Sequence, residues 1–249
     1  MLEKYHLLNI AKTQLALTLG CLPEQFNSRC PHVAFVHNSL PKSLEAGSFF
    51  KAASFAGGAV FSSSNKSFID RCRSTLSPLS KDWCFEPPVF EKLENGLKQN
   101  GYCLQRQKLY FLPSEQLRPK AAPQNIELRW YNRQQLEEFP LVPEYAKALE
   151  HNPERPDSLG VAAVKNGNIL GLAGASADYE TMWQIGIDVL PEGRGQEIAP
   201  LLVSQLAFRI LELGKIPFYG TAASHLISQN VAWKAGFFPA WAELSSTRV

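Results

Sequence analysis

A glycine-bearing loop at residues 193–199 is the part of the sequence best suited to hold an anion. It reads Gly-Arg-Gly-Gln-Glu-Ile-Ala and follows Pro191 and Glu192. A helical pattern begins at about Ala199 and continues to residue 213. A glycine loop that opens a helix directs several backbone N–H groups, and the positive end of the helix dipole, at one point. Arg194 adds a fixed positive charge to this predicted anion site.

The loop is preceded by an apolar, strand-compatible run from Met182 to Val189. Asp188 is unusual in such a run, because a carboxylate in a mostly buried strand needs a partner. Its residue type allows two interpretations. It could bind a cationic amine or act as a base, or it could be a structural anchor that accepts hydrogen bonds from neighbouring backbone.

The stretch Val189-Leu-Pro-Glu-Gly-Arg-Gly-Gln-Glu-Ile-Ala199 resembles the acetyl-coenzyme A loop of the GNAT acetyltransferases. Their usual pattern is a strand, then Pro-Glu-x-Arg-Gly-x-Gly-x-Ala, then a helix. The wider run 145–243 resembles a bacterial GNAT subgroup through Ala173-Gly-Ala-Ser176, Met182–Asp188 and Gly236-Phe237. The resemblance covers roughly the C-terminal half of the chain. It departs from the pattern at Glu197, where the family has its second glycine, and at Gln196, where lysine is common.

The resemblance implies acetyl-CoA as cosubstrate and CoA as product. The wide cysteine spacings argue against a structural zinc site, and no metal is predicted. Backbone N–H groups at a strand bulge polarise the thioester carbonyl in the family, and the matching positions here are 187–189. The implied cofactor-binding residues are Ile187, Asp188, Val189, Arg194, Gly195, Gln196, Glu197, Ile198, Ala199 and Ser228. A carboxylate at Glu197 weakens pyrophosphate binding unless it points away, whereas in the first turn of a helix it favours the dipole.

The same resemblance shows that one catalytic residue expected from the family is missing. A family tyrosine that protonates the leaving thiolate falls on Ala232, and a family asparagine falls on His225. Histidine exchanges protons near neutral pH, so His225 or a water could replace the tyrosine, or His225 could simply cap its helix. The catalytic candidates are therefore Asp188 and His225. The acidic groups 144–145 and 178–180 could receive an amine or be solvated loop residues.

Composition and charge describe an ordinary globular protein with two contrasting halves. The chain has 249 residues and a formal net charge of +2, which does not favour nucleic acid as the partner. Residues 1–120 carry 15 Lys and Arg against 9 Asp and Glu, whereas residues 121–249 carry 10 against 14. The proline-rich segment 113–123 predicts a boundary, with domains 1–118 and 119–249.

The predicted fold class is α/β (α+β). A GNAT fold, with a central mixed, mostly antiparallel sheet flanked by helices, follows a smaller α/β domain. From Ile126 the predicted order is β, α, α, β, β, β, α, β, α, β, with a helix over 143–151 and a hairpin at Asn166-Gly167. A cap at Ser224 and a strand over 55–61 are also predicted. Helix-glycine-aromatic echoes at 98–102 and 234–237 hint that the first half is a degenerate GNAT copy.

Five widely spaced cysteines without a C-x-x-C pattern favour free thiols and a reducing, cytoplasmic location. They are Cys21, Cys30, Cys72, Cys84 and Cys103. No apolar run reaches the length of a membrane span, so no membrane partner is expected. A homo-oligomer is compatible with the sequence, which does not test for it.

The predicted function is direct transfer of an acetyl group from acetyl-CoA to an amine of a small molecule or protein. No serine or cysteine nucleophile motif is visible, which disfavours a covalent enzyme intermediate. Two alternatives stay open: a non-catalytic acyl-CoA-binding or regulatory module, favoured by Glu197 and Ala232, and a double-GNAT aminoacyl transferase, favoured by the two-domain layout and the basic first half.

Overall fold

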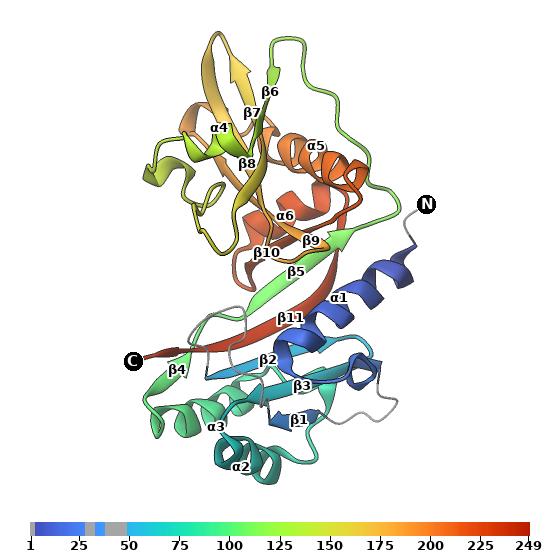
Figure 1. Ribbon diagram of the computed structural model, residues 1–249, viewed down its shortest axis with the longest axis vertical. Helices are drawn as coiled ribbons and strands as arrows, with labels where there is room; N and C mark the ends of the chain where they lie inside the picture. Colours follow the sequence, from blue (N-terminus) through green and yellow to red (C-terminus); the bar gives the residue numbers. More distant parts are fainter. Residues whose placement is uncertain (1–2, 28–32, 38–48) are drawn as a thin grey trace. The chain divides into compact units, whose positions relative to one another are not determined.

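The computed structural model describes residues 3–27, 33–37 and 49–249, and Figure 1 shows the course of the chain. The chain divides into two compact units. The first, here the 111–239 unit, holds Phe111–Pro239 and the start of the chain up to Leu7. The second, the 8–110 unit, holds Leu8–Tyr110 and Ala240–Val249. Whether 1–118 and 119–249 fold as separate domains stays a prediction.

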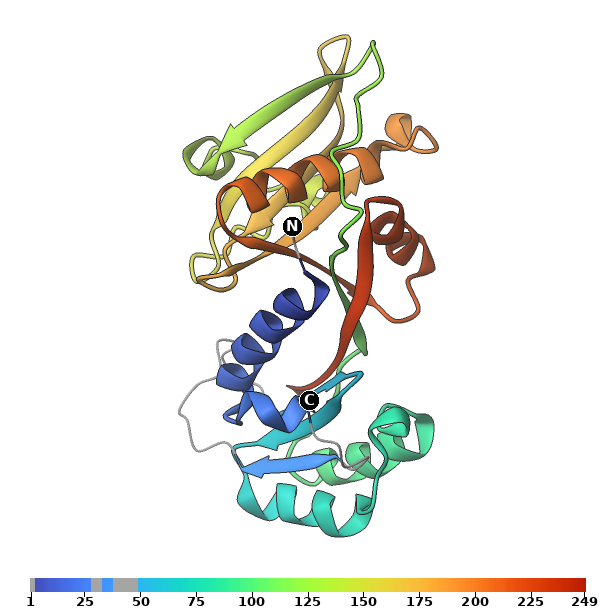
Figure 2. The ribbon, with the colours of Figure 1, turned by 90° about the vertical axis from the view of Figure 1, so that its right-hand side faces the viewer.

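The 111–239 unit is built on a mixed sheet. Its strand order is β5-β10-β9-β8-β7-β6, with antiparallel pairs from β6 to β9 and a parallel pair between β9 and β10. Helix α5 packs across β7, β8, β9 and β10 (Figure 2). The elements are β5 Lys108–Pro113, β6 Glu127–Asn132, α4 Arg133–Glu137, β7 Asp157–Lys165, β8 Asn168–Ser176, β9 Met182–Val189, α5 Ile198–Glu212, β10 Ile216–Ala222, α6 Leu226–Lys234 and β11 Phe237–Arg248, with 3₁₀ turns at Pro143–Tyr145 and Pro191–Gly193.

Local sequence signals account for two of these boundaries. Asn132 caps α4 by accepting a hydrogen bond from the Gln135 N–H, and the Gln135 side chain returns one to the Asn132 N–H. At the β7–β8 hairpin, Asn166 and Gly167 have φ of 51° and 82°, as a two-residue hairpin turn requires. Both predictions are confirmed.

The predicted helix over 143–151 is wrong, and the reason lies in β9. The segment begins with the short 3₁₀ turn Pro143–Tyr145 and then runs without regular helix. The N–H groups of Lys147 and Ala148 donate to Asp188 Oδ2 over 2.7 and 3.0 Å. These N–H groups are therefore committed to a neighbouring strand and cannot continue a helical ladder.

Two glycines let this segment lie directly on the sheet. Gly174 of β8 and Gly186 of β9 are cross-strand partners. A Cβ at Gly186 would overlap the Lys147 carbonyl oxygen, and one at Gly174 would overlap the Ala148 carbonyl oxygen. Small residues at these paired positions are thus a steric requirement for seating the 146–150 segment.

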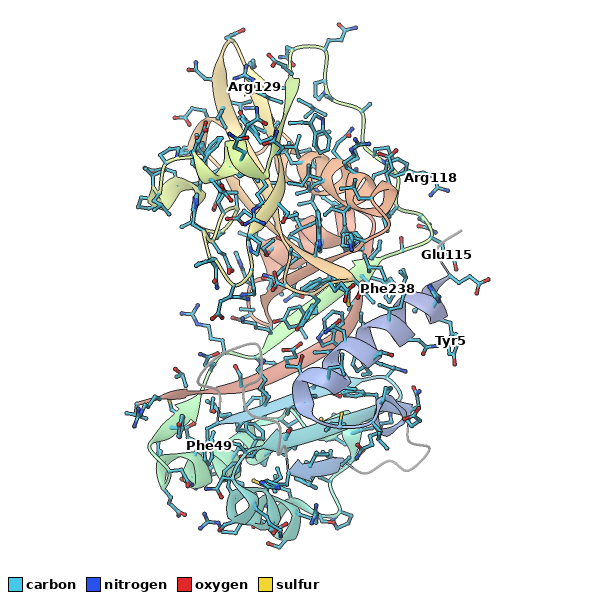
Figure 3. The ribbon with its side chains drawn as sticks, in the orientation of Figure 1. Tyr5, Phe49, Glu115, Arg118, Arg129 and Phe238 are labelled. Atoms are coloured by element: carbon cyan, nitrogen blue, oxygen red, sulfur yellow. The ribbon has the colours of Figure 1, made fainter. Side chains whose placement is uncertain are left out.

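The proline-rich segment 113–123 packs against α5 and Gly236. The Lys120 N–H donates to Ser204 Oγ at 3.1 Å, and the Gln205 side chain donates to the Lys120 carbonyl. Leu117 is 4% exposed and its backbone lies against Gly236, which has φ of 93°. Figure 3 shows Glu115 and Arg118 in this stretch, where the Arg118 guanidinium donates to the Glu115 carbonyl.

The strands of the 8–110 unit follow the order β1-β3-β2-β11, and β4 also pairs with β11. The strand predicted over 55–61 is instead the turn and flanks of a hairpin, because Ala56 and Gly57 form a turn between β2 and β3. A Cβ at Gly57 would overlap the Phe26 carbonyl oxygen. The elements are α1 Lys4–Leu19, β1 Ala34–His37, β2 Phe50–Phe55, β3 Gly58–Ser63, α2 Lys66–Leu76, α3 Pro87–Lys98 and β4 Tyr102–Leu104, with 3₁₀ turns at Pro23–Asn27 and Lys81–Trp83.

The cysteines that the structure describes are free thiols in this part of the chain. Burial raises the pKa of Cys21 and Cys72 to about 12 and that of Cys84 to about 11. Cys30 lies outside the described residues. Among the helices described, none has the length and apolar character needed to cross a membrane.

A Gly186→Ala change tests the seating of the 146–150 segment. We expect it to lower the free energy of unfolding by about 1–3 kcal/mol, because the new methyl group collides with fixed backbone. Urea unfolding measures the change. Gly160→Ala on β7 is the control, since the nearest atom there is a flexible Leu136 methyl group. An equal decrease in the free energy of unfolding in the two variants would show that the close backbone contact at Gly186 does not contribute to stability.

Candidate active site

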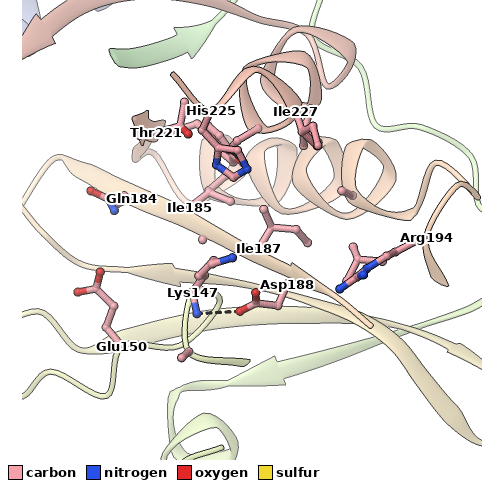
Figure 4. A pocket seen from close by; sticks show the side chains of 18 residues that line it. Lys147, Glu150, Gln184, Ile185, Ile187, Asp188, Arg194, Thr221, His225 and Ile227 are labelled. Atoms are coloured by element: carbon pink, nitrogen blue, oxygen red, sulfur yellow. Dashed lines mark hydrogen bonds between the residues drawn. The ribbon is translucent and has the colours of Figure 1, made fainter. Parts of the chain in front are cut away.

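The sheet opens between β9 and β10, and a cavity of about 420 Å³ lies at the opening. The two strands pair in parallel as far as Ile185 and Tyr219. Beyond that point β9 continues to Val189 beside β8 alone. The cavity is lined by residues 186–189 and 219–221, by the 146–150 segment, and by the starts of α5 and α6 (Figure 4).

The start of α5 leaves a row of unpaired donors. Among the described residues, the backbone N–H groups of residues 195–199 donate to no protein acceptor. Glu197 is the N-cap residue of α5 but makes no capping hydrogen bond with its side chain, and Pro200 has no N–H. Gly195 has φ of 72°, and a Cβ there would meet no atom within 4 Å. These N–H groups and Arg194 suit an exposed anion such as a phosphate.

The Glu197 carboxylate is directed to Lys234. Glu197 adopts the left-handed conformation, with φ of 57°, which explains why glycine suits this position. Its Oε1 lies 2.6 Å from Lys234 Nζ on α6, and the two side chains are 62% and 44% exposed. The ion pair holds the carboxylate and offsets its charge beside the row of N–H groups. The Gln196 side chain donates to the Glu192 carbonyl at 2.5 Å.

Strand β9 presents two further N–H groups to the opening. The Leu190 N–H bonds to the Leu170 carbonyl, so Asp188 also pairs with β8 by alternation. The N–H groups of Ile187 and Val189 therefore face away from β8, towards the side that β10 has left. The β8–β9 register is unbroken over 171–176 and 184–189, so the expected bulge in this strand is absent there.

The described structure favours the anchor interpretation of Asp188. Its Oδ2 accepts both hydrogen bonds from the 147–148 backbone, as noted above. The carboxylate also lines the cavity. Its role as a base stays a prediction.

Tyr219 is a candidate acid that the sequence did not reveal. Its hydroxyl lies 2.7 Å from Ser228 Oγ, and both residues line the cavity. Burial raises the pKa of Tyr219, the hydrogen bond with Ser228 opposes the rise, and the Asp188 carboxylate adds to it. Tyr219 therefore keeps its proton at neutral pH. It can donate to a bound sulfur directly or through Ser228.

The other predicted positions divide between the cavity wall and the loop. Ile187, Asp188, Val189, Arg194, Ala199, His225 and Ser228 line the cavity. Gly195, Gln196, Glu197 and Ile198 lie outside the lining and offer backbone N–H groups, and the Ile198 side chain is 2% exposed. The predicted cap at Ser224 is wrong, because His225 is the N-cap residue of α6 and makes no capping hydrogen bond with its side chain. Whether the predicted cofactor-binding residues contact a ligand stays a prediction.

Three more residues of the lining went unnoticed in the sequence: Lys147, Glu150 and Gln184. No motif marks them, because Lys147 and Glu150 lie in a loop, where polar residues are common, and Gln184 is a single polar residue within β9. The acidic groups considered from the sequence lie elsewhere. Asp178 accepts a hydrogen bond from the Ser176 hydroxyl at 2.5 Å and forms an ion pair with Arg155 at 3.3 Å. Tyr145 lines a separate pocket beside the β7–β8 hairpin.

Comparison with known proteins identifies the domain. Residues 125–237 match the model of the acetyltransferase (GNAT) family. This region belongs to the GNAT superfamily. The matched region contains the cavity, the loop and both splayed strands, and it is an acyltransferase domain by this membership. None of the curated proteins compared matches the sequence.

Several solved structures share similarity with this chain. A GCN5-related N-acetyltransferase-like protein from Streptococcus suis has 16% identity and a TM-score of 0.47, over 66% of this chain and 69% of that one. A GNAT-family acetyltransferase from Colwellia psychrerythraea has 16% identity and a TM-score of 0.43, over 64% and 62%. A tandem GNAT protein of the clavulanic acid biosynthesis pathway has 16% identity and a TM-score of 0.45, over 62% and 57%. The chain spans less than two thirds of the last two proteins.

A Tyr219→Phe change in the GNAT domain tests the acid role. We expect kcat to fall about 100-fold with little change in KM, because the proton donor is lost while the cavity keeps its shape. In the native enzyme activity should persist up to about pH 10 and fall above it, since the protonated form acts and its pKa is raised. Tyr131→Phe, which packs on Phe139 outside the cavity lining, is the matched control. A kcat within twofold of the native value would refute the role.

The Glu197–Lys234 pair predicts a specific pattern of CoA affinity. Lys234→Met should weaken binding about two- to fivefold, because it leaves the Glu197 carboxylate uncompensated near the N–H groups. In a Glu197→Gly background the same change should have no effect. Calorimetric titration of CoA into the four proteins completes this double-mutant cycle. An equal effect of Lys234→Met in both backgrounds would mean that the ammonium contacts CoA itself.

Proposed function

We propose that the GNAT domain transfers an acetyl group from acetyl-CoA to an amine in one direct step. The observation that carries this proposal is the series of backbone N–H groups that face one opening of the sheet. The N–H groups of residues 195–199 lie at the start of α5, and those of Ile187 and Val189 face the opening from β9. A molecule with phosphate at one end and a carbonyl at the other matches this series.

In the proposed complex the pyrophosphate of acetyl-CoA binds at residues 195–199 beside Arg194. The pantetheine then enters the opening between β9 and β10. Its thioester carbonyl accepts hydrogen bonds from Ile187 or Val189, which stabilise the oxygen as it becomes negative. No side chain of the protein needs to form a covalent bond with the acetyl group.

The transfer itself requires two proton movements. The neutral amine attacks the thioester carbon, so a C–N bond forms and the C–S bond breaks. The departing sulfur takes a proton from Tyr219, directly or through Ser228, and the amine loses one to His225 or to water. Tyr219 regains its proton from solvent before the next cycle. The products are an N-acetylated amine and CoA.

The alternative function is that of a CoA-binding module without catalytic activity. It draws on Glu197 at a glycine position and on the fully buried Ala232 where an acid would be expected. Tyr219 can serve as a different proton donor, so the proposed acetyltransferase activity does not depend on the residue at position 232. We keep the cytoplasm as the proposed location, because the cysteine pattern suits a reducing compartment.

A Gly195→Trp change tests the cofactor site. We expect it to reduce acetyl-CoA affinity at least about 100-fold, because an indole would occupy the space in front of the N–H groups. The matched control is Gly214→Trp at the opposite end of α5. Gly195 and Gly214 have φ of 72° and 73°, and a Cβ at either meets no atom within 4 Å, so the backbone strain is equal.

Calorimetric titration measures the acetyl-CoA affinity of the native protein and of both variants. Micromolar binding that survives Gly214→Trp and disappears in Gly195→Trp supports the proposed site. Absence of binding by the native protein at millimolar acetyl-CoA would refute the function. Tight binding without CoA release across amines would instead support the non-catalytic module. Chromatography should measure CoA, since the cysteines would react with thiol reagents.

A further inference from the structure

The part of the cavity away from Arg194 carries one acidic and one basic side chain. In Figure 4, Glu150 and Gln184 lie at one end of the cavity, Arg194 lies at the other, and Lys147 extends between them. If the donor's phosphates lie at Arg194, the end with Glu150 is left for the acceptor. The charges at this end then report the chemistry of the acceptor.

Glu150 is held in place from behind the cavity wall. Its Oε2 lies 3.2 Å from Arg155, whose guanidinium also contacts Asp178 at 3.3 Å. The Asp178 side chain is 8% exposed and accepts a hydrogen bond from Ser176. This cluster has two carboxylates and one guanidinium, so it attracts a further cation. The exposed member of the cluster is Glu150, which lines the cavity.

Lys147 is positioned by its own backbone. Its N–H donates to Asp188, and its carbonyl oxygen lies against Gly186. These contacts fix the start of the side chain at the edge of the opening, and Figure 4 shows the ammonium directed towards the cavity beside Ile187. In the described chain Lys147 forms no ion pair within 4 Å. An anionic group entering the cavity would find a cation without a protein partner.

We infer that the acceptor is a primary amine that also carries an anionic group, either a carboxylate or a phosphate. This inference rests on the proposed acetyl transfer. The acceptor's ammonium enters on the side of Glu150 and Gln184, and its anionic group pairs with Lys147. The ammonium then gives one proton to solvent, so that the neutral amine attacks the thioester. An amine that carries positive charge alone would leave Lys147 without an anionic partner. The inference therefore predicts a preference for this acceptor over a simple alkylamine or polyamine that lacks the anionic group.

The experiment compares amines that differ in the anionic group alone. Phenylalanine is paired with phenethylamine, lysine with cadaverine, and phosphoethanolamine with ethanolamine, so the third pair tests phosphate and the first two test carboxylate. Acetylated product is measured by mass spectrometry with the full-length protein. Binding of each amine to the CoA-loaded protein is measured in parallel. We expect the anionic member of at least one pair to be favoured about 10-fold or more in kcat/KM or affinity.

Charge reversal at one residue then tests Lys147 directly. Lys147→Glu should reverse the preference within that pair, and Lys147→Met should abolish it. Lys165→Glu, in the β7–β8 hairpin outside this cavity, is the matched control and should leave the preference intact.

Each failure has a separate meaning. An equal loss for both members of every pair would overturn the inference and assign Lys147 to the donor instead. Failure of the native protein to distinguish any pair, in turnover or in binding, would also overturn it. Loss of acetyl-CoA binding by the native protein would refute the proposed function itself, and the calorimetric titration reports that independently.

Discussion

The site depends on the direct contact between the 147–148 backbone and the glycine pair of β8 and β9. Gly174 and Gly186 leave no side chains at this point, so peptide groups can lie on the sheet. Asp188 accepts hydrogen bonds from the two N–H groups that would otherwise have no acceptor where the segment packs on the sheet. This contact holds Lys147 and Glu150 over the opening. The position of the cavity wall that carries Lys147 and Glu150 therefore depends on two residues that have no side chain.

A second constraint concerns how β9 and β10 end their pairing. Parallel pairing stops at Ile185 and Tyr219, yet both strands continue. The N–H groups on the open side of β9 thus remain available to a ligand, while β8 satisfies those on the other side. The loop after β9 adds the donors at the start of α5. One break in a sheet exposes strand donors and brings them into the same cavity as Arg194 at the loop.

The sequence predicted what depends on local backbone chemistry. The Asn166-Gly167 turn, the Asn132 cap and the glycine loop before α5 each follow from residue type and spacing. The helix over 143–151 failed because a carboxylate far along the chain captures its N–H groups. Tyr219 was missed because β10 is buried on both faces, so alternation could not show which side chain faces the cavity. Long-range partners decided each of these outcomes.

If the first half of the chain is a degenerate GNAT copy, its helix α2 corresponds to α5 of the GNAT domain. In the 8–110 unit, β3 is followed by α2 as β9 is followed by α5, and both strands have a parallel neighbour. However, Asn65 caps α2 by accepting the Phe68 N–H, so a side chain already occupies the place of an anion. At α5 the corresponding side chain turns to Lys234 and leaves its N–H groups open. This cap is one reason why the start of α2 suits an anion less well than the start of α5 does.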